Sequence, residues 1–188
     1  MTDSNHHMHT IVALVQDHPG VLNRIASMFR RRGFNISSLA VGNSETVGLS
    51  RMTFVIDSAE EGSVEQITKQ LRKVIEVVKV SDLSSEDIVA RELALIKVKA
   101  PSAPTRAEVI QVVELFRAKI VDVASDSLII EVTGEEQKIA SILTLLGSFG
   151  ILEVMRTGTI AMNRGLESRQ DKNNPQRQTT SWDEATSV

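Results

Sequence analysis

The apolar residues of this 188-residue chain change repeatedly between the spacing of a β-strand and the spacing of an α-helix. Residues 9–15 are almost continuously apolar, which is typical of a strand at the centre of a sheet. Val21, Ile25 and Phe29 then recur at helical spacing, and Gly33 closes this helix. Two strands, a helix and a final strand follow, over 35–41, 51–56, 64–74 and 77–83. The pattern therefore predicts the order β-α-β-β-α-β.

The same order of elements starts again after a short polar break. Four strands are expected over 93–100, 120–124, 128–132 and 151–155, with a short extra strand over 159–162. The two helices are expected around 109–116 and 139–146. This repeated order predicts an α+β fold of two ferredoxin-like βαββαβ domains, each an antiparallel sheet with two helices on one face. The other face of each sheet has no helix, so we expect dimerisation or a partner to cover it.

Polar stretches set the expected boundaries. We expect a flexible N-terminus over 1–8, a first domain over 9–83, a linker over 84–90, a second domain over 91–163 and a disordered tail over 164–188. Three helix starts are indicated by capping-box spacing, in which Ser or Thr precedes Glu or Gln by three residues. These pairs are Ser63 with Gln66, Thr105 with Glu108, and Thr133 with Glu136.

The composition excludes several kinds of chemistry. The chain has no cysteine, which excludes disulfides, thiolate metal sites and cysteine nucleophiles, and it has no tyrosine. Three of its four histidines, His6, His7 and His9, lie at the N-terminus, and we expect no native metal site there. His18 is the one histidine in a turn of the fold, and no Ser or Asp is indicated as its partner. We therefore expect no catalytic residues in this chain.

Charge and hydropathy argue against nucleic acid and membrane. The 21 Lys and Arg residues and 24 Asp and Glu residues give a net charge of −3, which recruits neither nucleic acid nor an acidic membrane. The basic run 30–32 before Gly33 and Phe34 superficially resembles an RNA-binding strand, but it falls at a helix end. No apolar run approaches the ~20 residues of a membrane-spanning helix, and no secretory signal opens the chain. We expect a cytoplasmic protein.

The turn from Asp17 to Leu22 is the most informative segment. A buried strand leads into a carboxylate, then Gly20, then a helix. The unsatisfied backbone N–H groups at a helix start suit a ligand carboxylate, and glycine lets the ligand approach that backbone closely. Asp17 or a nearby Asn can accept from an ammonium group, so the turn suits an α-amino acid. Taken alone, however, this pattern is more typical of an ordinary helix cap.

Longer motifs resemble a known family. They include a Pro-Gly turn, an Arg-Gly-Phe-Asn-Ile segment and a Ser-Arg-Met-Thr segment, and they extend over about 9–165. These segments are 17–22, 29–39, 49–53, 66–71, 91–98, 116–123 and 156–158. The chain resembles the regulatory (small) subunits of acetolactate synthase, also called acetohydroxyacid synthase, which carry an N-terminal ACT domain.

The resemblance implies a noncatalytic subunit of a thiamine diphosphate-dependent transferase. Its partner, the catalytic large subunit, would hold thiamine diphosphate, Mg²⁺ and FAD in the first common step of branched-chain amino-acid (valine, isoleucine and leucine) biosynthesis. The small subunit would raise the activity of that partner and confer allosteric feedback inhibition by valine. The resemblance further implies that ACT domains pair side by side as a homodimer, with valine at their interface.

The residues implied at the valine site are Asp17, Gly20, Val21, Leu22 and Asn35, with Gly42 and Gln66 as lesser candidates. Asp17 stands where relatives carry Asn, and Ala40 stands where some carry Thr, so the effector preference stays open. The second half has no Pro-Gly turn after its first strand, and we expect no matching site in it. The alternative is a stand-alone ACT-type amino-acid sensor that acts on a different partner.

Overall fold

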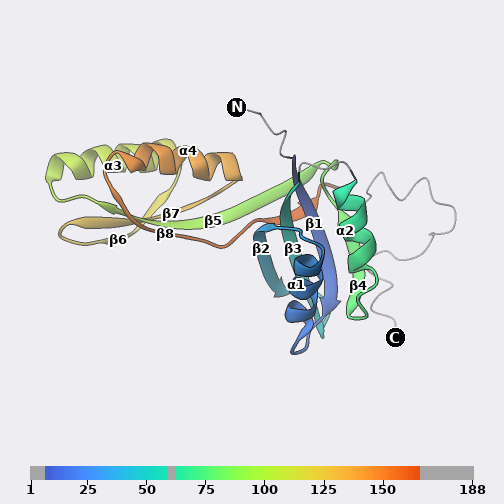
Figure 1. Cartoon of the computed structure of the whole chain (residues 1–188). Coiled ribbons are helices and arrows are strands. Elements are labelled where there is room, and N and C mark those ends of the chain that lie inside the picture. The colour runs from blue at the N-terminus through green and yellow to red at the C-terminus, as the bar shows by residue number, and fades with distance from the viewer. Residues whose placement is uncertain (1–6, 59–61, 166–188) are drawn as a thin grey trace. The chain divides into compact units, whose positions relative to one another are not determined.

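The computed structural model describes residues 7–58 and 62–165 (Figure 1). They form two compact units: one extends to Val89 and includes the stretch from Ala161, and the other is Ala90–Ile160. The flexible terminus expected over 1–8 and the tail expected over 164–188 lie largely outside the described residues. No described helix is long and apolar enough to cross a membrane.

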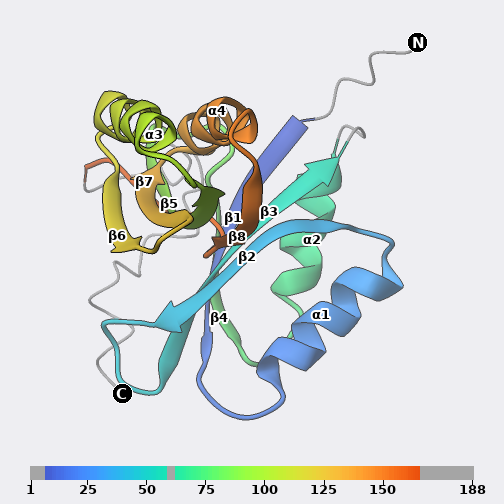
Figure 2. The same ribbon diagram turned by 90° about the vertical axis from the view of Figure 1, so that its left-hand side faces the viewer.

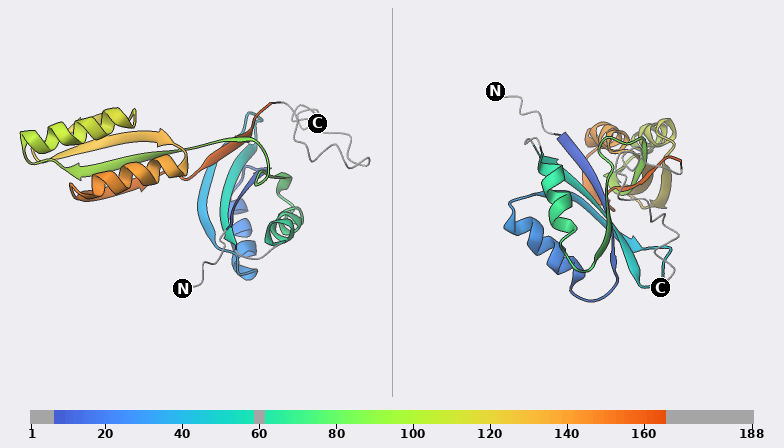
Figure 3. Two further views of the ribbon diagram at one scale, coloured as in Figure 1. Left: turned by 90° about the horizontal axis from the view of Figure 1, so that it is seen from above. Right: turned by 90° about the vertical axis from the view of Figure 1, so that its right-hand side faces the viewer.

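The first unit has the predicted order of elements. Its strands and helices are β1 (His7–Gln16), α1 (Val21–Arg31), β2 (Ile36–Asn43), β3 (Leu49–Ser58), α2 (Ser63–Leu71) and β4 (Val77–Asp82). The strands form an antiparallel sheet in the order β2-β3-β1-β4. Figures 2 and 3 show α1 and α2 on the same face of this sheet. The split βαβ fold predicted for this half is confirmed.

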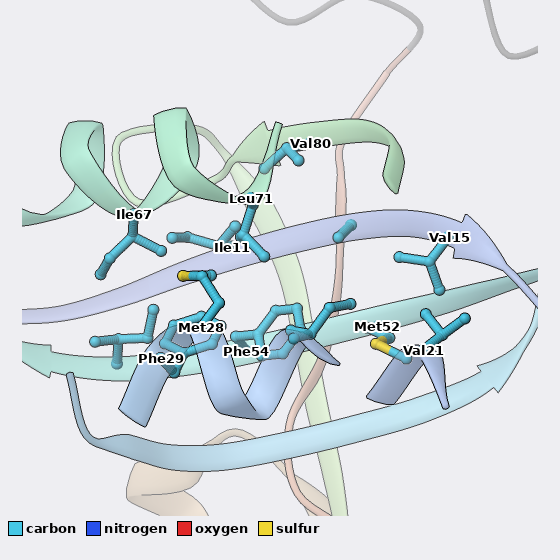
Figure 4. Packing of buried hydrophobic residues seen from close by; sticks show 13 residues of the cluster. Ile11, Val15, Val21, Met28, Phe29, Met52, Phe54, Ile67, Leu71 and Val80 are labelled. Atoms are coloured by element: carbon cyan, nitrogen blue, oxygen red, sulfur yellow. The ribbon is translucent and has the colours of Figure 1, made fainter. Parts of the chain in front are cut away.

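The core of this unit lies between the sheet and its two helices (Figure 4). Alternate β1 residues face the helices, and the rings of Phe29 on α1 and Phe54 on β3 meet with centroids 5.2 Å apart. Val12 and Leu14 are not part of this core cluster, yet they are also buried. The centre of β1 is thus covered on both faces, as its continuous apolar run predicts. The expectation that a second copy or a partner covers the open faces of the sheets stays a prediction.

The second unit repeats the arrangement. It contains most of β5 (Ile88–Lys99), together with α3 (Ala103–Leu115), β6 (Lys119–Val123), β7 (Ser127–Gly134), α4 (Glu136–Gly147) and β8 (Ile151–Arg156). The strand order is β6-β7-β5-β8, and the short strand β9 (Ile160–Asn163) also pairs with β5. Figure 2 shows α3 and α4 on one face of this sheet. The core joins residues such as Ile96, Ile130 and Ile139.

The helix starts differ from the capping-box predictions. The N-cap of α2 is Gly62 in a left-handed conformation, and Ser63 is already the first helical residue. The N-cap of α3 is Ser102, whose side chain accepts a hydrogen bond from the Thr105 N–H. Glu135 precedes α4 with no side-chain cap. Capping-box spacing alone therefore did not locate the helix starts. The backbone conformation of the residue before each helix decides where that helix begins.

Several strands begin earlier than predicted, and β1 and β5 show the reason. β1 starts at His7 instead of at residue 9, because its pairing with β3 extends to the end of that strand. β5 starts at Ile88, within the segment expected to be a linker, and it pairs with β9. Both extensions depend on pairing with segments distant in the sequence, which the local hydrophobic pattern does not contain.

Candidate functional site

The N-terminus of α1 has no side-chain cap. Its N-cap is Gly20, which adopts φ 95° and ψ −16°, a conformation that costs glycine little. The first turn of α1 contains no acidic residue. Leu22 is exposed, whereas the Val21 side chain is buried in the core, and the Val21 N–H donates a long hydrogen bond to the His18 carbonyl at 3.5 Å. This helix end carries the partial positive charge that attracts an anion.

Two backbone hydrogen bonds hold the β1–α1 loop, residues 17–20, at its upstream end. The Gln16 N–H donates to the Glu76 carbonyl at 2.9 Å, and the Asp17 N–H donates to the Gly48 carbonyl at 2.8 Å. The loop itself is exposed, and the His18 ring contacts the Pro19 carbonyl and the Gln16 side chain. The loop is therefore attached both to the start of β4 and to the β2–β3 turn.

Two acidic residues lie in the loops at this end of the sheet. Asp17 is exposed at the start of the loop. In the β2–β3 turn the pKa of Glu45 is lowered, chiefly by a hydrogen bond from its own backbone N–H and further by the Ser44 hydroxyl and the Arg51 guanidinium. Glu45 is thus ionised at neutral pH. Because Arg51 Nη2 lies 3.5 Å from Glu45 Oε2, the charge of Glu45 is compensated, and Asp17 is the carboxylate of the loop that is exposed to an ammonium group.

The structure brings some of the predicted site residues together. Asp17, Gly20, Val21 and Leu22 form one continuous loop and helix start. Gly42 on β2 pairs with Arg51, which in turn pairs with Leu14 on β1, so Gly42 lies across the sheet from the same end of β1. These residues surround the end of the sheet at which α1 begins.

Two predicted residues lie elsewhere. Asn35 follows the C-terminal end of α1, and the 11 residues of that helix separate it from Gly20 by about 16 Å. Figure 2 shows the two connections at opposite ends of α1. Gln66 is exposed on α2, and its N–H donates to the Gly62 carbonyl at 3.0 Å within the helix start. A single chain does not bring Asn35 to Gly20.

The sequence reasoning missed Glu76. Its side chain is 6% exposed, and its Oε1 lies 2.5 Å from Nη1 of Arg24 in the first turns of α1. Nothing in the sequence distinguishes this carboxylate from the exposed ones, because its burial depends on contacts with segments distant in the chain. The capped N-terminus of α3 provides a contrast, since the Ser102 side chain already occupies that helix end.

The part of the chain that the structure describes contains no cluster of three or more His, Asp or Glu residues that could hold a metal ion. His9 lies in β1 and His18 in the β1–α1 loop, so they belong to different elements.

Both halves of the chain match known protein families. Residues 11–79 match the family described as the AHAS small subunit-like ACT domain, and residues 91–165 match the family described as the small subunit of acetolactate synthase. The first unit is therefore an ACT domain, followed by a second domain of like topology. The crystal structure of the acetolactate synthase small subunit from Thermotoga maritima matches with a TM-score of 0.77 and 44% identity, over 84% of this chain and 98% of that one.

The chain is similar in sequence to its relatives over nearly their whole length. The acetolactate synthase small subunit of Bacillus subtilis is 49% identical over 87% of this chain and 94% of its own. That of Mycolicibacterium smegmatis is 51% identical over 84% of this chain and 91% of its own. The chain belongs to the acetolactate synthase small-subunit family. The resemblance found in the sequence motifs is confirmed.

Proposed function

We propose that this chain activates the catalytic large subunit of acetolactate synthase and makes it sensitive to valine. Membership of the small-subunit family implies such a catalytic partner. The observation that carries the effector role is the start of α1 beside Asp17, where no side chain caps the helix, since it offers backbone donors to a carboxylate and an acceptor to an ammonium group. An α-amino acid presents these two groups a few ångströms apart.

The proposed pose follows from these charges. The valine carboxylate lies at the backbone amides of Gly20 to Leu22, and its ammonium group lies near Asp17 or near Asn35 of a second copy. The isopropyl group faces apolar side chains across the interface between the copies. Gly42 lies at the same end of the sheet and is a lesser contact, whereas Gln66 on α2 is the more remote candidate.

A homodimer through β2 would complete the site. β2 is an edge strand, so one side of its backbone is available for pairing with another chain. A two-fold axis beside β2 makes the two β2 strands antiparallel and sets the two α1 helices side by side in opposite directions. The start of α1 in one copy then lies near the end of α1, and thus near Asn35, in the other. In this dimer Gly20 and Asn35 of one site come from different copies, which agrees with their separation within one chain.

The chemistry of the reaction belongs to the partner in this proposal. Thiamine diphosphate, Mg²⁺ and FAD would be held by the large subunit, and this chain would supply no catalytic residue. Its part is to bind valine between two copies and to change the activity of the assembled enzyme. Because the site needs both copies, effector binding and assembly are thermodynamically linked. We place this complex in the cytoplasm.

Reconstitution tests the proposal. The large subunit, supplied with its three cofactors, is assayed for acetolactate formation from pyruvate with and without this chain, and valine, leucine and isoleucine are titrated into each mixture. We expect co-purification, a higher rate with the chain present, and inhibition by valine only in the mixture that contains it. A chain that binds valine without co-purifying or raising the rate would instead be a stand-alone sensor. Turnover by this chain alone would contradict the noncatalytic role.

A further inference from the structure

The Glu76 carboxylate is buried beside the β1–α1 loop. The residue is 4% exposed, although its neighbour Ile75 is 83% exposed. Its Oε1 pairs with Nη1 of Arg24 at 2.5 Å, and the Arg24 side chain is 58% exposed. Among the described residues, no hydrogen-bond donor reaches Glu76 Oε2. The pair thus places a largely desolvated carboxylate against a solvent-facing guanidinium.

Glu76 contacts the chain on both sides of this loop. Its backbone carbonyl accepts from the Gln16 N–H, immediately before Asp17. Its side chain pairs with Arg24, whose own N–H donates to the Gly20 carbonyl at 3.0 Å, immediately after the loop. Through one residue, the start of β4 is therefore attached to the end of β1 and to the first turn of α1.

This arrangement is a poor way to gain stability. Burial of a carboxylate with one oxygen unpartnered is unfavourable, and an apolar residue of similar size often stabilises a protein as well or better. The pair does fix the position of the start of α1. A short charged hydrogen bond has a preferred geometry, so it restricts where α1 can begin relative to β1 and β4. The backbone amides at that helix start are those proposed to bind the effector carboxylate.

We infer that Glu76 is a positioning residue for the effector response: through Arg24 and Gln16 it holds the β1–α1 loop in the geometry that accepts an amino-acid carboxylate. This inference rests on the proposed function and adds a residue to it that does not touch the ligand. Glu76 holds the loop from the β4 side of the sheet, opposite the β2 edge at which the second copy is proposed to bind, while the Gly48 carbonyl in the β2–β3 turn holds it at Asp17.

The test compares the complex carrying Glu76→Gln with the wild-type complex. Glutamine keeps the shape of the side chain and removes its charge, so the ion pair with Arg24 is lost. We expect the valine concentration for half-maximal inhibition to rise between about twofold and about thirtyfold, the range of couplings measured for residues remote from a ligand. Activation of the large subunit by the variant is measured in the same assay.

Arg24 provides the second arm. Arg24→Gln is expected to raise the half-inhibitory valine concentration to a similar extent, and the double variant to raise it no further, since both changes break one interaction. Arg24→Lys keeps the positive charge and should restore most of the sensitivity. Glu65→Gln is the matched control, because Glu65 pairs with Lys69 on α2 at 2.6 Å with both side chains exposed. This control should leave inhibition unchanged.

The outcomes separate this inference from the proposed function. If the wild-type complex is insensitive to all three branched-chain amino acids, the proposed function fails. If the wild type is sensitive and both Glu76→Gln and Arg24→Gln are equally sensitive, only the role of Glu76 is overturned. A lower melting temperature with unchanged valine inhibition shows a purely structural pair and also overturns it. If Glu76→Gln does not fold, the Arg24 variants decide, since Arg24 faces solvent.

Discussion

Two glycines in the first domain provide a matched pair at the scale of single residues. Gly20 and Gly62 are the N-caps of α1 and α2, with φ of 95° and 84°. A Cβ built on either glycine meets no atom within 4 Å. Any side chain there is consequently strained by its backbone and not by its neighbours. The two positions differ in that only Gly20 lies in the proposed effector site.

We predict that Gly20→Asp abolishes valine inhibition of the reconstituted enzyme, because it places a carboxylate where the effector carboxylate binds. The same substitution forces a non-glycine residue into a left-handed conformation, which costs about 1–2 kcal/mol of stability. The measurements are a valine titration of the activity and a urea unfolding curve of the purified chain.

Gly62→Asp is the control for that experiment. It introduces the same charge and the same backbone strain at the start of α2, so its unfolding free energy should fall by a similar amount. Valine inhibition should be retained. If both variants lose inhibition, the loss reflects strain in the domain, and the proposed location of the effector site is wrong.

The two edge strands of the first sheet decide how the domain can pair. β2 and β4 stand at opposite edges, and each carries a half-exposed valine: Val41 on β2 and Val78 on β4 are both 49% exposed. An unpaired edge is a template for another strand. Only pairing through β2 brings the start of α1 toward the partner's α1, so the proposed site requires that edge.

We predict that Val41→Asp weakens the homodimer at least about tenfold, because the two-fold axis would bring two new carboxylates close together in a desolvated interface. Sedimentation equilibrium of the purified chain gives the dissociation constant. Val78→Asp should leave that constant unchanged. Dissociation caused by Val78→Asp, with Val41→Asp still dimeric, would place the interface at β4 and contradict the proposed geometry.

At the scale of the whole molecule, the chain contains two units with separate cores. The core of the first unit is built around Phe29 and Phe54, and that of the second around Ile96 and Ile130. Each sheet has its own pair of helices, so each unit buries its apolar residues against its own elements. Domains of this kind are expected to lose their core packing individually.

We predict that Phe54→Ala destabilises the first unit by about 3–5 kcal/mol, because it leaves a cavity beside Phe29. Hydrogen exchange monitored by mass spectrometry should show lost protection in β1 and β3, with β5 and β7 protected as in the wild type. Ile130→Ala is the reciprocal variant and should affect β5 and β7 instead. Equal loss of protection in both units after either substitution would show a single cooperative unit.

Much of this protein followed from local patterns in the sequence. Hydrophobic period depends only on residues close in the chain, so it predicted both βαββαβ domains and the burial of the central strand over residues 11–15. The Pro-Gly turn likewise predicted that α1 begins directly after Gly20, since glycine adopts the left-handed backbone of this position easily. The family motifs were recognisable because they are runs of neighbouring residues.

Tertiary structure alone decided what depends on segments distant in the chain. It buried Glu76 against Arg24, residues that belong to different elements and have no shared motif. It extended β1 and β5 through pairing with strands distant in the sequence. It also separated Asn35 from Gly20 by the length of α1, because a rigid helix fixes the distance between its ends.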